Sequence, residues 1–329
     1  MLDNIIVEKG IIKNHLGIER DGDFIKPIRF TKKQFAAYSL TEPLAVRSRC
    51  MAGICLDMIT DSDFVRFDYV VKGIVRNWIY FDVFLNDVFV ESIGSDQVDE
   101  GEYTFEYRVE SKAKEKNQKN RITIYLPYNI DLSMGNFRLA ENAFISGIKP
   151  YDKTLLCLGD SITQGMDARH PSCIYPVLLS RFLKMELLNQ GVGGYVFNSD
   201  SLDENFSLKP DIITVAYGTN DWSKCSSPEE FRHNCRDYME KLVSLFPDID
   251  IYVMTPFWRE DLNEMRDAGS FYDLSDTIKD VCRAYPKVVV LDGLELIPHL
   301  PAYFGDKWVH PSDEGFKDIA LNFLAKTRL

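Results

Sequence analysis

The sequence lacks an apolar run long enough to cross a membrane. Its unbroken apolar stretches, such as Leu155–Leu158 and Val288–Leu291, are far shorter than the roughly 18 residues that a spanning helix needs. Basic residues are also in deficit, because 38 Lys and Arg face 50 Asp and Glu, which leaves a net charge of −12. A chain this acidic is atypical of proteins that bind duplex nucleic acid or an anionic membrane surface. We therefore expect no transmembrane helix and neither a nucleic-acid nor a membrane partner.

We expect no secretion signal at the first residues, and the sequence lacks a recognisable metal motif. Asp3 and Glu8 stand where a basic segment would begin a signal peptide, and no apolar segment follows them. The seven cysteines are dispersed and form no CxxC pair. Cys50 and Cys55 lie close together, but no second pair and no neighbouring histidine completes a zinc site. We expect a cytoplasmic protein with reduced thiols and no metal.

Residues 1–150 have the periodicity of antiparallel strands. The composition is that of a globular protein, and 329 residues are enough for about two domains. In the first part apolar and polar residues alternate, as they do in strands with one wet face. The alternating apolar series are Val65, Phe67, Tyr69 and Val71, then Ile79, Phe81, Val83 and Leu85, then Phe105, Tyr107 and Val109. We predict an all-β domain, a sandwich or jelly roll, over residues 1–150.

Two connecting segments have no functional assignment. The basic stretch at 112–120 lies between two alternating strands, and we interpret it as a solvated hairpin loop without a partner. At 149–152 the sequence Lys-Pro-Tyr-Asp precedes a new pattern, and its proline favours a break there. We place the domain boundary at this segment.

Residues 151–329 alternate short apolar strands with helices. Unbroken apolar strands are typical of a parallel sheet that is buried on both faces. We expect strands near 154–158, 185–189, 211–217, 250–255 and 287–291. Apolar residues at helical spacing predict three helices between and after them, with Ile174, Val177, Leu178 and Phe182 on one, Phe231, Cys235, Tyr238, Leu242 and Leu245 on the next, and Phe316, Ile319, Ala320, Phe323 and Leu324 on the last. This series predicts a three-layer α/β/α, doubly wound fold.

Polar residues and glycines follow several of these strands, at the sheet edge where such folds bind ligands. Ser161 lies in the turn Gly-Asp-Ser-Ile-Thr after the first strand, as a candidate nucleophile or a simple helix cap. The second strand ends in a glycine block, Gly191-Val-Gly-Gly194, whose N–H groups can hold an oxyanion. The block lacks the spacing of a dinucleotide-binding motif.

Two more candidates follow later strands. Asn220 lies in Gly-Thr-Asn-Asp after the third strand, where its amide is a neutral donor toward developing negative charge, or simply a turn residue. His310 precedes a proline and the last helix, so the imidazole is presented from a rigid turn. It is the natural general base.

In having these four residues in this order, residues 153–329 resemble the SGNH, or GDSL-type, hydrolase family. The Gly-Asp-Ser-Ile-Thr, Gly-Thr-Asn-Asp and His-Pro motifs are together specific, and the glycine block is a weaker motif. The resemblance implies a flavodoxin-like parallel sheet. It also implies serine chemistry that needs no metal or organic cofactor.

The resemblance assigns a role to each residue. Ser161 attacks an ester carbonyl and His310 takes its proton. The N–H of Ser161, the N–H of Gly194 and the amide of Asn220 form the oxyanion hole. Gly194 is chosen because it lies five residues after the asparagine that ends the strand, with Gly193 as the alternative.

The spacing of the acidic residue departs from the family pattern. The family usually has two residues between its aspartate and the histidine, whereas Asp306 and His310 enclose three. Either Asp306 orients His310 from an altered loop, or a backbone carbonyl accepts the ring N–H in a Ser-His dyad; we favour Asp306. We expect Asp160 to brace the serine turn and Asp313 to complement the dipole of the last helix.

A β-sandwich followed by an SGNH domain is similar to certain carbohydrate esterases that remove acetyl groups from sugars. Tyr195, Trp258 and Trp308 lie near the motifs and offer flat faces to sugar rings, although aromatic residues equally suit an interface between domains. We therefore expect a serine esterase. Its expected substrates are short-chain esters, chiefly acetyl esters, of a small molecule or an oligosaccharide.

Two other functions stay open. A lipid-type acylhydrolase or thioesterase would prefer longer chains. The absence of a long apolar lid region disfavours only a triacylglycerol lipase. A non-catalytic glycan-binding protein on the same scaffold would keep its activity without Ser161. The first domain can bind glycan, form a wall of the active site or support a homo-oligomer, and the sequence does not decide among these.

Overall fold

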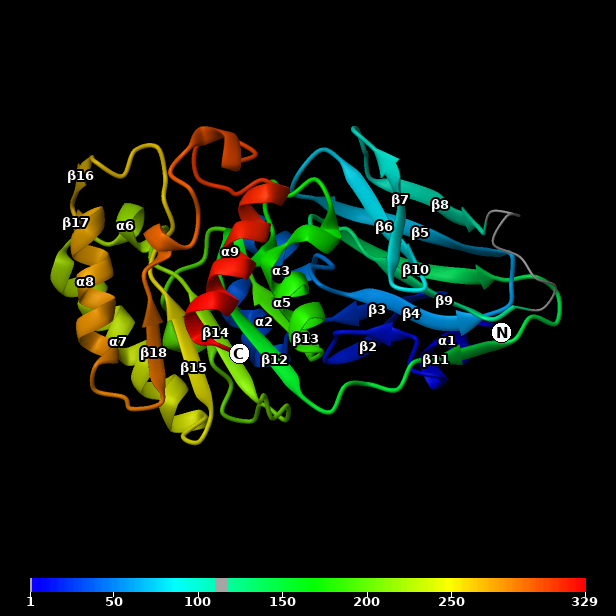
Figure 1. Cartoon of the computed structure of the whole chain (residues 1–329), viewed down its shortest axis with the longest axis horizontal. Helices are drawn as coiled ribbons and strands as arrows, with labels where there is room; N and C mark the ends of the chain where they lie inside the picture. The colour runs from blue at the N-terminus through cyan, green and yellow to red at the C-terminus, as the bar shows by residue number, and fades with distance from the viewer. Residues whose placement is uncertain (1, 110–117) are drawn as a thin grey trace.

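The computed structural model describes residues 2–109 and 118–329, and its elements form a β-sandwich joined to an α/β layered unit (Figure 1). The loop expected at 112–120 lies mostly outside the described residues. One sandwich sheet has the order β1-β4-β9-β6-β7, with β11 beside β4. Its strands are β1 Ile12–Lys13, β4 Cys55–Thr60, β9 Asn120–Tyr125, β6 Ile79–Leu85, β7 Val88–Ser95 and β11 Ile145–Gly147.

The second sandwich sheet has the order β2-β3-β10-β5-β8. Its strands are β2 Gly17–Asp21, β3 Phe24–Ile28, β10 Ile130–Arg138, β5 Phe64–Ile74 and β8 Gly101–Arg108. Alternate side chains of the two sheets meet between them, as the period of two predicts. The ring of Phe67 on β5 lies 4.7 Å from that of Phe105 on β8 and 6.0 Å from that of Phe81 in the other sheet. The predicted β-sandwich is confirmed.

The first part of the chain also contains helices that the sequence pattern did not predict. They are α1 Leu2–Glu8, α2 Lys32–Tyr38 and α3 Glu42–Arg49. Thr31 caps α2 in a capping box with Gln34, so the local sequence does carry a helix start signal. The expectation of an all-β segment was wrong here. Helix α2 packs against the 3-10 turn η3 Ser199–Ser201 of the α/β unit, and α3 packs against α2 and against β10 of the sandwich.

The parallel sheet has the order β13-β12-β14-β15-β18, and this confirms the predicted doubly wound fold. Its strands are β12 Thr154–Gly159, β13 Glu186–Gly191, β14 Ile212–Ala216, β15 Asp250–Met254 and β18 Val288–Leu291. The chain leaves β12 toward β13 on one side and returns to β14 on the other. The strand order therefore reverses at β12, where such folds form their binding crevice.

Helices cover both faces of this sheet. The helices α5 Tyr175–Leu183 and α9 Asp313–Thr327 pack against each other, as do α7 Pro228–Leu245 and α8 Phe271–Cys282. Right-handed crossovers place the two pairs on opposite faces. The expected inward-facing helix positions are buried or partly buried, except Phe182, which is 54% exposed. The short elements are α4 Ser161–Gln164, α6 Asp221–Lys224, the hairpin β16 Met265–Arg266 with β17 Gly269–Ser270, and the 3-10 turns η2 Pro171–Cys173, η3 Ser199–Ser201, η4 Gly293–Glu295 and η5 Pro301–Tyr303.

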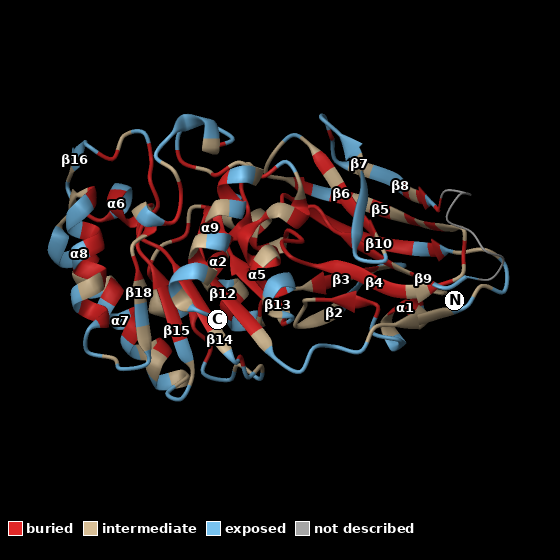
Figure 2. Cartoon of the chain, viewed as in Figure 1, coloured by how far each residue is buried: buried red, intermediate tan, exposed pale blue. Residues whose placement is uncertain are grey.

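The two parts of the chain share buried surface. Phe30, Tyr38 and Tyr128 from the first part belong to the same apolar cluster as the strands of the parallel sheet. Buried residues accordingly continue from one part into the other (Figure 2). The hydroxyl of Tyr128 also donates to the carbonyl of Ala168, over 2.7 Å. Among the described helices, none has both the length and the apolar character that crossing a membrane requires.

Candidate active site

The turn after β12 fixes Ser161 at the first position of α4. The N-cap is Asp160, whose side chain accepts from the N–H of Ile162, so Ser161 is not itself the cap. A Cβ at Gly159 would lie 2.0 Å from Thr163 Oγ1, and one at Gly191 would lie 2.2 Å from the N of Gln164. Only glycine fits at these two positions, so β12 and β13 can approach α4 closely and hold the serine in place.

His310 lies within hydrogen-bond distance of this serine. Its Nε2 is 2.9 Å from Ser161 Oγ, and its Nδ1 is 2.7 Å from Asp306 Oδ2. The other oxygen of Asp306 accepts the backbone N–H groups of Trp308, Val309 and His310. The backbone of residues 307–309 thus turns around one carboxylate oxygen of Asp306. With three residues between Asp306 and His310, the other oxygen still reaches the imidazole.

A second carboxylate contacts the same imidazole nitrogen. Asp167 Oδ2 lies 3.0 Å from His310 Nδ1, and Arg76, which follows β5, binds both oxygens of Asp167. Asp167 has a φ of 68°, and a Cβ on Gly305 would lie 2.6 Å from its carbonyl oxygen. Sequence reasoning missed both Asp167 and Arg76. The only local signal was an aspartate six residues after the serine, in the same turn region.

The two carboxylates control the protonation of His310. Burial alone would lower the pKa of His310, but the hydrogen bonds to Asp167 and Asp306 outweigh it and raise the pKa above its ordinary value. Burial would raise the pKa of Asp306, yet its bonds to His310 and to the backbone N–H groups hold it well below the usual range. The pair therefore favours a proton on Nδ1, which leaves Nε2 as the acceptor facing Ser161.

The carboxylates beside His310 are not arranged to bind a cation. Asp167, Asp306 and His310 are the one cluster of potential metal ligands among the described residues. However, Arg76 binds both oxygens of Asp167, and backbone N–H groups and His310 occupy those of Asp306. Cys50 and Cys55 are buried free thiols outside this cluster.

The glycine block lies beside Ser161. A Cβ on Gly193 would be 3.4 Å from Ser161 Cβ, and Gly194 has a φ of 82°. The N–H of Gly193 donates to Gln164 Oε1 over 2.8 Å and is therefore occupied. Within the part of the chain that the structure describes, the N–H of Gly194 has no acceptor. Of Gly193 and Gly194, only Gly194 has a backbone N–H that is free to bind an oxyanion.

Asn220 stands on the other side of the serine turn. Its Nδ2 lies 3.1 Å from the carbonyl oxygen of Tyr195 and 3.3 Å from Asp160 Oδ2. Asp221 holds this turn by accepting from the N–H groups of Gly218 and Phe197. Burial raises the pKa of Asp160 to about 6. Asp160 thus braces both the serine and the asparagine turns, as expected for its position.

The three aromatic candidates differ in exposure. The ring of Tyr195 is 3% exposed and packs 4.3 Å from that of Tyr38, so its face is not open to a substrate. Trp258 is 9% exposed and packs against Phe304. Trp308 is 46% exposed. Interface packing therefore accounts for Tyr195 and core packing for Trp258. Of the three, Trp308 alone is well exposed, and the guanidinium of Arg259 lies over its ring, 5.4 Å from the centroid.

Asp313 has a further contact that was not expected. It lies in the first turn of α9, as predicted, and it also accepts from the N–H groups of Arg169 and His170. Asp313 therefore connects the start of α9 to the loop that follows Asp167.

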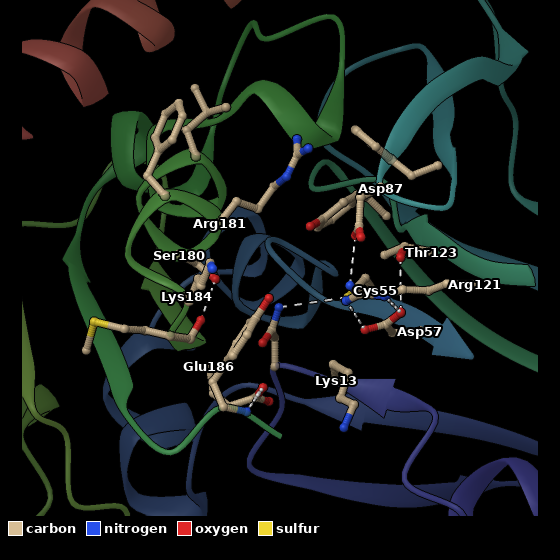
Figure 3. Close-up of a pocket in the computed structure, with 17 residues that line it drawn as sticks. Lys13, Cys55, Asp57, Asp87, Arg121, Thr123, Ser180, Arg181, Lys184 and Glu186 are labelled. Atoms are coloured by element: carbon tan, nitrogen blue, oxygen red, sulfur yellow. Dashed lines mark hydrogen bonds and ion pairs between the residues drawn. The ribbon is translucent and has the colours of Figure 1, made fainter. Parts of the chain in front are cut away.

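A cavity of about 540 Å³ lies away from this cluster, at the amino end of β13 between the sandwich and the α/β unit. Figure 3 shows Arg121 between Asp57 and Asp87 on the sandwich side, with Arg181 and Glu186 on the other. None of the residues expected to carry chemistry lines this cavity. The candidate active site is the cluster of Ser161, His310 and Asp306 at the carboxyl ends of the strands.

The α/β unit matches a known family. Residues 157–317 match the model of the GDSL-like Lipase/Acylhydrolase family. No curated protein matches the sequence.

Solved structures share the fold over nearly the whole chain. A salicylyl-acyltransferase from a tetracycline biosynthetic pathway has a TM-score of 0.76 at 17% identity, covering 96% of this chain and 93% of that one. A putative GDSL-like lipase from Bacteroides ovatus has a TM-score of 0.75 at 17% identity, with coverage of 97% and 95%. An acetyl xylan esterase from Butyrivibrio proteoclasticus has a TM-score of 0.60 at 15% identity, with coverage of 84% and 88%. Residues 157–317 are thus similar to the GDSL-like Lipase/Acylhydrolase family, and the chain shares its fold with these solved structures over most of its length.

Proposed function

We propose that this protein is a serine esterase that hydrolyses short-chain acyl esters, chiefly acetyl esters on carbohydrates. The observation that carries the proposal is the hydrogen-bonded chain from Ser161 Oγ to His310 Nε2 and from His310 Nδ1 to Asp306, with distances of 2.9 and 2.7 Å. These distances lie in the range that a nucleophile, its base and an orienting group require.

The proposed reaction has two halves. Ser161 Oγ attacks the ester carbonyl carbon while its proton passes to His310 Nε2. The resulting oxyanion binds the N–H groups of Ser161 and Gly194 and the amide of Asn220, which exchanges its longer bond, to Asp160 Oδ2, for the oxyanion. The bond between the carbonyl carbon and the alcohol oxygen of the ester then breaks, and His310 gives the proton to the leaving alcohol. Water attacks the acyl-enzyme with His310 again as base, which releases the acid and restores the serine.

An exposed aromatic ring favours a sugar as the carrier of the acyl group. The exposed ring of Trp308, close to the proposed base in sequence, offers an apolar face to a sugar. An acetyl xylan esterase and carbohydrate esterases among the structural neighbours add support from fold alone.

The test compares wild type, Ser161→Ala and Ser180→Ala on p-nitrophenyl acetate, butyrate and octanoate, with acetylated xylo-oligosaccharide alongside. Ser180 is a matched control, because it is also a buried serine, and it binds the carbonyl of Met185 away from the site. We expect acetate preference, acetate release from the oligosaccharide, and loss of both in Ser161→Ala only. Preference for octanoate would indicate a lipid-type acylhydrolase or thioesterase. Sugar binding without any turnover would indicate a glycan-binding protein.

A further inference from the structure

The glycine block is held by side chains and backbone from the first part of the chain. Arg29 is 2% exposed, and its Nη1 donates to the carbonyls of Asn189 and Gly191 at the end of β13. Its Nη2 donates to the carbonyl of Arg47 on α3, over 3.0 Å. Burial lowers the pKa of Arg29 to about 10, so it remains charged at neutral pH. A buried cation therefore connects α3 to the strand that leads into the block.

Arg47 continues this connection to the block itself. Its Nη1 donates to the carbonyl of Gly193 over 2.9 Å, and its own backbone carbonyl accepts from Gln164 Nε2 over 3.1 Å. Gln164 Oε1 accepts the N–H of Gly193. Arg47 and Gln164, from α3 and α4, thus bind Gly193 on both of its polar groups.

The polar groups of the two glycines leave a single donor unoccupied. The carbonyl of Gly194 accepts from Lys224 Nζ over 2.5 Å, the N–H of Gly193 binds Gln164, and the carbonyl of Gly193 binds Arg47. The remaining group, the N–H of Gly194, has no acceptor among the described residues. This N–H belongs to the same peptide unit as the carbonyl that Arg47 binds.

A charged donor on a peptide carbonyl polarises the whole amide. Hydrogen bonds in series strengthen one another, so the N–H opposite the bound carbonyl becomes a better donor. The bond also fixes the plane of the peptide, and an oxyanion hole gains from donors that are oriented before the reaction. The guanidinium of Arg47 can approach this peptide because the glycines have no side chains. A Cβ on Gly194 would lie only 2.8 Å from Arg47 Nη1.

We infer that Arg47 is a positioning residue for the oxyanion hole. It orients and polarises the Gly193–Gly194 peptide, so the N-terminal domain completes the active site. This inference rests on the proposed function, because it needs Ser161 to form a tetrahedral intermediate whose oxyanion binds Gly194.

The test uses the full chain with three variants. Arg47→Met removes the charged donor, and Arg47→Lys restores a cation. Arg49→Met is the matched control, because Arg49 lies on the same helix but pairs with Asp131 of the sandwich. The readouts are kcat and KM on p-nitrophenyl acetate, the melting temperature, and the rate at which a fluorophosphonate labels Ser161, followed by intact mass. Labelling needs the nucleophile and the oxyanion hole but no knowledge of the natural substrate.

In Arg47→Met we expect kcat and the labelling rate to fall together by about tenfold or more, with KM nearly unchanged and a melting temperature like that of Arg49→Met. Arg47→Lys should recover part of both rates. Wild-type rates in Arg47→Met would overturn the inference, and so would a loss limited to substrates that carry a carboxylate, which would make Arg47 an anion-binding residue.

Failure of the proposed function would look different. If wild type is labelled at Ser161 but hydrolyses no carbohydrate ester, the substrate proposal fails, and the labelling rates still decide the role of Arg47. If Ser161 is neither labelled nor needed for turnover, the serine mechanism fails and the inference about Arg47 fails with it.

Discussion

Arg76 binds both carboxylate oxygens of Asp167, with Nε 2.6 Å from Oδ1 and Nη2 3.0 Å from Oδ2. The arginine follows a strand of the β-sandwich, and the aspartate follows the serine turn. Asp167 Oδ2 also lies 3.0 Å from His310 Nδ1. A sandwich residue therefore fixes a second carboxylate against the proposed catalytic base, beside Asp306.

The second carboxylate should set the pH dependence of the reaction. The pKa of His310 is raised, and a general base works only in its neutral form, so kcat/KM should rise with pH through a value above the ordinary 6.5. Asp167→Asn removes one of the two charges that stabilise the imidazolium, so the pKa of His310 should fall and the acidic limb should move to lower pH. The measurement is kcat/KM for p-nitrophenyl acetate from pH 5 to 9.

Asp57→Asn is the matched control for this experiment. Asp57 is also bound on both oxygens by an arginine, Arg121, but it lies in the sandwich without a histidine partner. Its profile should keep the wild-type midpoint. An Asp167→Asn profile that superimposes on that of wild type would show that Asp167 does not act on His310.

Asp306→Asn should be the more damaging of the two carboxylate changes. Asp306 makes the shorter bond to Nδ1, 2.7 Å, and also holds the loop by accepting three backbone N–H groups. We expect kcat to fall about 10²-fold, less than in a site with a single carboxylate because Asp167 still faces the imidazole. Steady-state kinetics of Asp306→Asn, Asp167→Asn and the double variant measure this. A double variant no slower than Asp306→Asn would mean that Asp167 gives no support.

The candidate residues could be predicted because each lies after a strand of the parallel sheet, in a recognisable motif. Ser161 and Asn220 follow β12 and β14 closely, whereas His310 lies between the partly exposed edge strand β18 and α9, so the motif was needed as well as the strand periodicity. Asp306 could be proposed but not oriented from sequence, because its approach depends on a turn in which Lys307 has a φ of 62°.

The supporting residues were not predictable in the same way. Arg76 and Asp167 are 91 residues apart in sequence, and Arg47 and Gly193 are 146 apart. No periodicity or motif joins such pairs, because their contact results from how the sandwich packs against the α/β unit. The helix that carries Arg47 was itself missed, since the alternation of the flanking strands dominated the pattern.

Asn220→Ala tests the oxyanion hole independently of the glycine block. The amide of Asn220 is the one side-chain donor proposed for the oxyanion, and removing such a donor costs about 10²–10³ in kcat. We expect that loss with little change in KM, because the interaction forms only as charge develops. Asn198→Ala is a suitable control, since Asn198 contacts the hydroxyl of Tyr195 and caps a 3-10 turn. Equal loss in both variants would indicate a structural effect.

Trp308→Ala separates sugar binding from ester chemistry. The ring is 46% exposed, while the backbone of Trp308 is held by Asp306 and Glu260, so the side chain can be removed without opening the loop. If the ring stacks on a sugar, KM for acetylated xylo-oligosaccharide should rise about five- to tenfold, while kinetics on p-nitrophenyl acetate stay near wild type. Tyr272→Ala, which removes a 51% exposed ring from α8, should change neither substrate. A parallel loss on both substrates in Trp308→Ala would place the indole in support of His310 instead, and the carbohydrate specificity would then have to come from other residues.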